Sequence, residues 1–288
     1  MNKTEAPRYA PEWLELREGA DAAARALGLL DPLQQWLSAQ EEAEETQGRR
    51  GRRMVIHDLG CGTGSMGRWL APRLNGPQHW ILHDRDPALL DLAAVRTPSA
   101  AGDGSAVTVA TQRGDIARMT AKRLAGASLL TASALLDVLT RDEVDALAAA
   151  CAEAACPALL ALSVVGRVEL TPAEPMDAEI AEAFNAHQRR NGLLGPDAVS
   201  VASVAFARQG ATVRAESSAW RLGADDSTLT VEWLRGWVGA ACEQRPDLAR
   251  RADSYLLRRL AACASGELRV VVHHSDLLAL PRKAGGSS

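Results

Sequence analysis

The segment over residues 54–67 carries the clearest chemical signal in the sequence. A short apolar run ends at Asp58 and leads into a turn that contains Gly60, Gly62 and Gly64. Glycine adopts backbone angles that other residues resist, and it lets a ligand approach the main chain closely. A helix that begins just after these glycines would direct unpaired N–H groups and a partial positive charge into the turn. The segment therefore predicts a strand, a turn and a helix that together hold a small ligand.

Two further aspartates follow predicted strands later in the chain. Asp84 follows a strand expected over 78–83, and Asp115 follows one expected over 106–112. Open parallel sheets bind ligands outside the carboxyl ends of their strands, so we expect these side chains to share one site with Asp58. A carboxylate directly before the turn suits a positively charged ligand better than a pyrophosphate.

The turn also satisfies the dinucleotide pattern GxGxxG, from Gly62 to Gly67, and Asp84 lies 20 residues beyond Gly64. Taken alone, this pattern is a weak indicator of nucleotide binding. An NAD(P)-dependent oxidoreductase therefore remains an alternative. The sequence lacks the Tyr-x-x-x-Lys pair of one common hydride-transfer apparatus.

Four motifs in one order resemble those of the class I S-adenosylmethionine-dependent methyltransferases. They cover residues 58–64, 84–90, 114–116 and 131–136. The resemblance implies a Rossmann-like α/β fold, with a seven-stranded, mostly parallel, doubly wound sheet and added N-terminal and inserted helices. It also implies S-adenosyl-L-methionine as the cofactor. One departure is Ser128, where many members have Asp at the start of the fourth motif.

The resemblance also assigns roles to the motif residues. Asp58 would lie on the ammonium side of the cofactor, and Asp84 would accept both ribose hydroxyls. Asp115 would accept the adenine amino group, Ile116 would pack on the ring, and Ser133 would border the methyl group. The complete set implied for the cofactor is Asp58, Gly60, Cys61, Gly62, Gly64, Asp84, Arg85, Asp115, Ile116 and Ser133. The alternative for each aspartate is a strand-end or turn carboxylate without a ligand.

The helix expected over 177–190 carries the first candidates for the methyl-acceptor side. Ile180, Phe184 and His187 fall on one helical face, and Arg190 follows one turn later. We interpret His187 as a general base, and Phe184 and Arg190 as contacts to an acidic or carboxylate substrate. The alternative is a structural histidine beside a surface arginine.

Other acceptor-side candidates lie on the first helix and after the fourth strand. One side of the first helix carries Trp13, Arg17, Asp21 and Arg25, which could form a lid over the cofactor or an ion-paired surface. Trp13 and Arg17 are also candidates for contact with the substrate. Asp137 follows the fourth strand closely enough to reach a substrate and is a second candidate for catalysis, its alternative being a loop carboxylate. Trp233 and Trp237 are four residues apart, and we expect them in the core together with Trp220.

The elements that must position these residues alternate between strand and helix. After the strand of the glycine segment, strands are expected over 78–83, 106–112, 128–133, 159–165, 212–221 and 268–274. Such alternation predicts a parallel sheet with helices on both faces. The expected organisation is an N-terminal helical cover (1–48), a methyltransferase domain (49–280) with helical insertions at 166–210 and 228–264, and a disordered tail (281–288).

Composition narrows the class of protein further. The chain of 288 residues has 47% apolar residues and a net charge of −4, which argues against nucleic acid as its partner. Its five cysteines form no CxxC pair, and His273 and His274 have no third ligand nearby, so we expect neither a disulfide framework nor a metal site. Free thiols favour a reducing, cytoplasmic location. No apolar run is long enough to predict a membrane span.

Together these features predict methyl transfer to an O, N or C nucleophile of a small molecule, by in-line displacement that yields S-adenosylhomocysteine. A catalytically silent S-adenosylmethionine-binding protein is a further alternative to the oxidoreductase. The sequence leaves the acceptor and the oligomeric state open.

Overall fold

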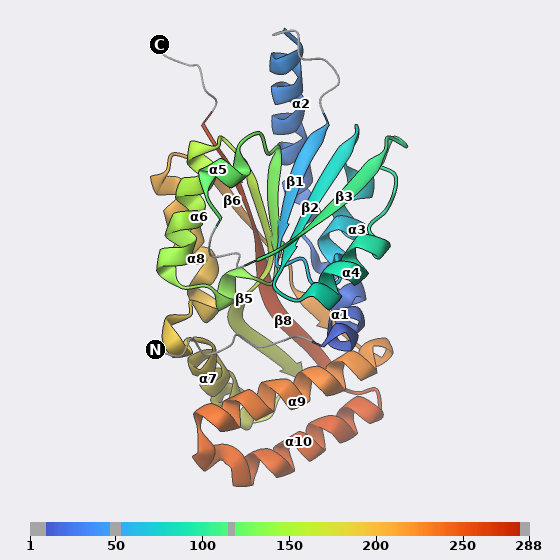
Figure 1. The fold of residues 1–288 in the computed structure, drawn as a ribbon. Coiled ribbons are helices and arrows are strands. Elements are labelled where there is room, and N and C mark those ends of the chain that lie inside the picture. The colour runs from blue at the N-terminus through green and yellow to red at the C-terminus, as the bar shows by residue number, and fades with distance from the viewer. Residues whose placement is uncertain (1–9, 47–52, 115–118, 283–288) are drawn as a thin grey trace.

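The computed structural model describes residues 10–46, 53–114 and 119–282, and its centre is a twisted sheet (Figure 1). The strands are β1 (Met54–Leu59), β2 (Gln78–Asp84), β3 (Val107–Arg113), β4 (Leu129–Ser133), β5 (Ala158–Thr171), β6 (Thr212–Ser217), β7 (Trp220–Leu222) and β8 (Arg269–Leu280). Their order is β3-β2-β1-β4-β5-β8-β6, and β7 pairs with β8 beside this path. Strands β1 to β5 are parallel, whereas β8 is antiparallel to its neighbours. The mostly parallel, doubly wound sheet is confirmed.

Helices cover both faces of the sheet and divide the core into two layers. The helices are α1 (Pro11–Ala24), α2 (Leu30–Thr46), α3 (Ser65–Leu70), α4 (Pro87–Arg96), α5 (Ala121–Leu124), α6 (Arg141–Glu153), α7 (Met176–Gln188), α8 (Ala198–Arg208), α9 (Ser227–Gln244) and α10 (Ala249–Ala264). Buried side chains of α5, α6 and α8 pack on one face, and those of α2, α3 and α4 pack on the other. The central strands are therefore apolar runs rather than alternating ones.

A third layer, which we call the cap, lies beyond one end of the sheet. It consists of α7, α9 and α10 and packs on the extended ends of β5 and β8 (Figure 1). Strand β5 continues across two register irregularities, where its pairing with β8 shifts. Such bulges bend a strand, and here β5 carries the chain from the sheet into the cap.

Several boundaries differ from those predicted. Residues 166–171, assigned to a helical insertion, continue β5, because they pair with β8 outside the parallel part of the sheet. Likewise β8 runs to Leu280, so His273 and His274 lie within the strand rather than at its end. The strand expected over 212–221 is divided into β6 and β7.

Two further findings concern the described ranges as a whole. Among these residues, no helix combines the length and the hydropathy that a bilayer span requires. Nor do three or more His, Cys, Asp or Glu side chains of these ranges gather as a metal site would require. Residues 283–288 of the expected tail lie outside the described part of the chain.

Candidate functional site

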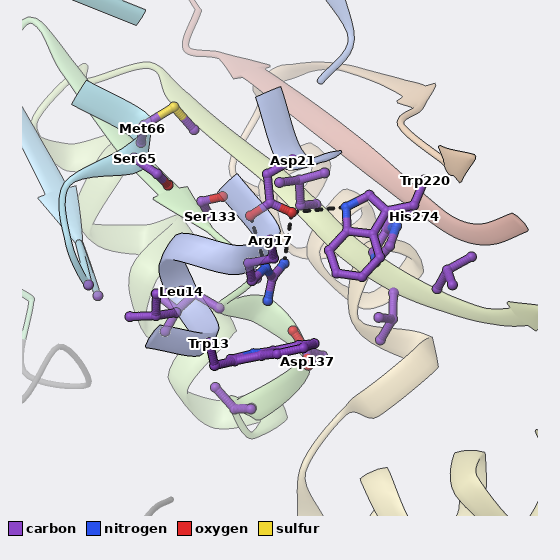
Figure 2. Close-up of a pocket in the computed structure, with 18 of the residues that line it drawn as sticks. Trp13, Leu14, Arg17, Asp21, Ser65, Met66, Ser133, Asp137, Trp220 and His274 are labelled. Atoms are coloured by element: carbon purple, nitrogen blue, oxygen red, sulfur yellow. Dashed lines mark hydrogen bonds and ion pairs between the residues drawn. The ribbon is translucent and has the colours of Figure 1, made fainter. Parts of the chain in front are cut away.

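A cavity of about 500 Å³ opens at the carboxyl ends of β1, β2 and β4 and extends toward the cap. Figure 2 shows part of its lining. One side, which we call the glycine wall, is formed by Asp58, Gly60, Gly62, Ser65 and Asp84. The other, which we call the tryptophan wall, is formed by Trp13, Phe184, Trp220, Trp233 and Trp237.

The glycine wall depends on a backbone that only glycine adopts easily. Gly60, Gly62 and Gly64 have φ angles of 59°, 54° and 86°, in the left-handed region. A Cβ atom on Gly62 would lie 3.1 Å from Cδ1 of Leu14, which belongs to α1. Glycine is therefore required in this turn, both to avoid backbone strain and to let α1 approach closely.

Asp58 is the most buried acidic side chain of the glycine wall. It has no exposed surface, and its Oδ1 accepts a hydrogen bond of 2.7 Å from Oγ1 of Thr131. Its Oδ2 is buried without a partner among the described residues. Burial raises the pKa of Asp58 to about 7, against 3.8 ordinarily. An unpartnered carboxylate oxygen at a cavity suits a ligand that donates hydrogen bonds from a cation.

Asp84 stands at the end of β2 and braces the turn. Its Oδ2 accepts from the N–H of Gly62 at 3.0 Å, and its Oδ1 accepts from the N–H of Asp86 at 3.0 Å. Each carboxylate oxygen can accept a further hydrogen bond from a ligand. Arg85 also lines the cavity.

Of the other residues implied for a cofactor, two line the cavity and two lie outside the described part of the chain. Cys61 lines the cavity, and burial raises the pKa of its thiol, so it serves as a backbone element rather than a nucleophile. Ser133 also lines the cavity. Asp115 and Ile116 lie outside the described residues.

Arg25, which follows directly after α1, is a buried cation behind the cavity. It is 3% exposed, and its Nη2 donates to Oγ of Ser65 and of Ser133, at 3.1 Å each. Asp276 anchors the adjoining chain, because its carboxylate accepts from the N–H groups of Ala26 and Leu162 at 2.9 and 2.7 Å. Burial lowers the pKa of Arg25, while the charges of nearby aspartates oppose that shift.

Helix α1 crosses the cavity, and its side chains are tied down. Arg17 pairs with Asp21 at 2.9 Å, and Asp21 Oδ1 accepts from Nε1 of Trp220 at 2.9 Å (Figure 2). The Arg17 guanidinium also lies 5.0 Å from the Trp220 ring centroid. Arg17 and Trp13 both line the cavity, and the charge of Arg17 is paired with Asp21.

Asp137 follows β4 in a short 3₁₀ turn and lines the cavity. Its Oδ1 is buried without a hydrogen-bond partner in the described ranges. Burial raises the pKa of this carboxyl group. Asp137 thus has a free acceptor atom at the cavity and could take up a proton from a ligand bound there.

His187, interpreted from the sequence as a general base, is not among the residues that line the cavity. Its Nε2 is 3.0 Å from Oε2 of Glu243 on α9, and Arg190 approaches the same carboxylate at 3.4 Å. Phe184, three residues earlier, does line the cavity. The two residues are neighbours on α7, and the contact with Glu243 on α9 draws the His187 side chain to the edge of the face that carries Phe184.

Comparisons with known proteins give structural neighbours alone. No family model matches the sequence, and no curated protein matches it. A methyltransferase from Geobacter sulfurreducens, solved with S-adenosyl-L-homocysteine, is 16% identical; the match covers 95% of this chain and 99% of that one, with a TM-score of 0.41. A mycolic acid cyclopropane synthase is 14% identical over 83% and 82%, with a TM-score of 0.42. A magnesium protoporphyrin IX methyltransferase from Synechocystis PCC 6803 is 15% identical over 64% and 76%, with a TM-score of 0.39.

The strand order itself decides the fold. Five parallel strands with β1 at the centre are continued by an antiparallel β8 between β5 and β6. The glycine turn follows β1, where the resemblance of the motifs requires it. The chain therefore has a mostly parallel, doubly wound α/β sheet, as expected from the resemblance of its motifs.

Proposed function

We propose that this protein transfers a methyl group from S-adenosyl-L-methionine to a small molecule. The observation that carries the proposal is the unpartnered Oδ2 of Asp58, buried at the cavity beside the glycine turn. A cofactor with an ammonium group would satisfy that atom. A pyrophosphate would meet it with like charge.

The glycine wall fits this cofactor in further respects. Asp84 has the spare lone pairs to accept two hydroxyl groups of a ribose, while its present bonds keep the carboxylate fixed. The left-handed glycines leave the main chain uncovered for close approach. Behind them, Arg25 holds Ser65 and Ser133 and supplies positive charge that partly offsets Asp58.

When bound, the cofactor supplies an electrophilic methyl group on a positively charged sulfur. The tasks of the protein are then to position the acceptor and to keep water out. Helix α1 and the tryptophan wall cover the cavity. We assign proton uptake from an acceptor O–H or N–H group to Oδ1 of Asp137, in place of His187.

Calorimetric titration tests the cofactor. S-adenosyl-L-methionine and S-adenosylhomocysteine are titrated in parallel with NAD and NADP. We expect binding of the first pair, weakened about 10- to 100-fold by Asp84→Asn, because hydrogen bonds to a charged group contribute about 1.5–3 kcal/mol. Asp91→Asn is the matched control, since Asp91 is exposed on α4. Binding of NAD or NADP without S-adenosyl-L-methionine would overturn the proposal.

Turnover tests the role of Asp137, with the acceptor identified by mass spectrometry of ligands that co-purify. We expect Asp137→Asn to lower kcat by about 100-fold or more, with S-adenosylhomocysteine affinity unchanged. Asp142→Asn, an exposed change in α6, should leave kcat as it is. Full kcat in Asp137→Asn would show that the carboxylate is not the base. Cofactor binding without methylation of any co-purified compound would instead favour a silent binding protein.

A further inference from the structure

The aromatic residues of the chain are concentrated on the cavity. The sequence has seven Trp and two Phe, and aromatic residues make up 4% of it. Four of the Trp residues and one Phe line the cavity, and they come from α1, α7, β7 and α9: Trp13, Phe184, Trp220, Trp233 and Trp237. The last three belong to one buried apolar cluster with the cap, and Trp13 and Phe184 pack against that cluster. Leucine and alanine fill most of the other two core layers, in which the buried aromatic side chains of the described residues are Trp69, Trp80 and Phe206.

The tryptophan wall is rigid and in part flat. Trp233 and Trp237 are 9% and 2% exposed, and their rings stack with centroids 5.0 Å apart and planes 17° apart. Trp220 is fixed by its hydrogen bond to Asp21 and by Arg17 against its face. Preorganised ring faces favour a ligand with rings of its own, through stacked or edge-to-face contacts.

Unpartnered polar atoms interrupt this apolar wall. Nε1 of Trp237, a donor, and Oδ1 of Asp137, an acceptor, are buried without partners among the described residues. The same holds for Nδ1 of His274, whose ring packs against Trp220 and whose pKa is lowered to about 4 by burial. Buried polar groups are normally hydrogen-bonded, so these atoms indicate a ligand that both donates and accepts hydrogen bonds.

The charges at this side of the cavity are already balanced. Arg17 is paired with Asp21, and Arg167 is paired with Glu169 at 2.5 Å. His273 contacts the same Glu169 at 2.9 Å. Among the described residues, the tryptophan wall therefore offers no surplus cation to hold a carboxylate or phosphate, unlike the arrangement expected around Arg190.

We propose that the methyl acceptor is a planar aromatic molecule with a phenolic or anilinic group, bound against the tryptophan wall with that group toward Asp137. The proposal rests on the proposed function and narrows its substrate class. In the reaction, the acceptor heteroatom forms the new bond to the methyl carbon as the carbon–sulfur bond breaks. The electron pair of that bond stays on sulfur, and the proton of the acceptor passes to Asp137.

Three probes with one ring skeleton test the substrate class: 2-naphthol, decahydro-2-naphthol and 2-naphthoate. Their affinities are measured by calorimetry with and without saturating S-adenosylhomocysteine. We expect 2-naphthol to bind about tenfold tighter than either other probe, because ring–ring contacts add to apolar burial and because a carboxylate has no free cation. Equal or tighter binding of decahydro-2-naphthol or 2-naphthoate, or no binding of 2-naphthol, would overturn the acceptor class. Failure of S-adenosylhomocysteine to bind would instead refute the proposed function.

Substitutions of tryptophan residues test whether 2-naphthol binds against the tryptophan wall. Trp233→Leu should weaken 2-naphthol about tenfold, whereas Trp36→Leu should not, because Trp36 lies on α2 outside the cavity lining. Trp237→Phe keeps a ring in the core but removes the N–H donor, and it should weaken 2-naphthol several-fold while leaving S-adenosylhomocysteine affinity unchanged. Unchanged 2-naphthol affinity in both Trp233→Leu and Trp237→Phe would place the probe elsewhere and refute the proposal.

Discussion

Replacing Asp58 by Asn should raise the folding stability of the protein and lower its affinity for the cofactor. Burial holds the pKa of Asp58 at about 7 in the folded protein, whereas the unfolded chain ionises near 3.8. Between these values the unfolded state has lost a proton that the folded state keeps. Folding stability therefore falls as pH rises through this window, since the unfolded state binds fewer protons. Asparagine is neutral at every pH and removes the dependence.

The size of this effect follows from the two pKa values. A difference of about three pKa units corresponds to about 4 kcal/mol once pH is well above 7, with each unit near 1.4 kcal/mol. Between pH 5 and pH 8, the free energy of unfolding of Asp58→Asn should gain about 2–3 kcal/mol relative to the wild type. Asparagine can still accept the hydrogen bond from Thr131, so the packing around the turn is retained.

Urea unfolding at pH 5, 6, 7 and 8 measures the stability difference, and calorimetry at pH 8 measures binding. S-adenosylhomocysteine should bind Asp58→Asn about 10- to 100-fold more weakly, through loss of a charge-assisted hydrogen bond. 5′-Methylthioadenosine lacks the ammonium group, and its affinity should not change. A stability difference that is constant with pH would refute the assigned pKa of Asp58. Equal weakening of both ligands would refute its contact with the ammonium group.

Three further substitutions test other parts of the site. His187→Ala should change kcat/KM for the co-purified acceptor by less than about twofold, since this side chain contacts Glu243 outside the cavity. A large loss of kcat/KM would instead support His187 as the general base. Gly62→Ala should lower the free energy of unfolding by about 1–2 kcal/mol in urea, because of its left-handed φ; an unchanged midpoint would contradict the strain. Glu18→Gln removes an ion pair of 2.6 Å that ties α1 to Arg68, and stopped-flow should show faster S-adenosylhomocysteine release with little loss of stability; an unchanged release rate would exclude α1 as a gate.

The part of the site that lies within one strand–turn–helix unit was predictable from sequence. Asp58 and the glycines are neighbours in the chain, so their types and spacing define the turn locally. Asp84 was predictable for a related reason, because parallel strands end at one edge of the sheet. These residues needed no knowledge of packing between distant elements.

The acceptor side could not be predicted in the same way. A helical face shows that Phe184 and His187 are near each other but not which of them turns toward α9. The tryptophans were expected in the core, and they are indeed buried, but contact between α1, β7 and α9 also makes them a wall. The unpartnered Oδ1 of Asp137 is likewise a product of tertiary burial, for which the sequence contains no local signal.

The length of β5 has a consequence for how substrates exchange. Alternate residues Leu162, Val164, Gly166 and Val168 all line the cavity, so one continuous strand forms its floor from the glycine wall into the cap. Because one strand connects the glycine wall to the cap, we expect the two sides of the cavity not to open as separate bodies. Substrates and products should therefore enter and leave the cavity under α1. Ion pairs of Glu15 and Glu18 hold this helix against α4 and α3. Because salt weakens such ion pairs, we expect the rate of product release to rise with ionic strength.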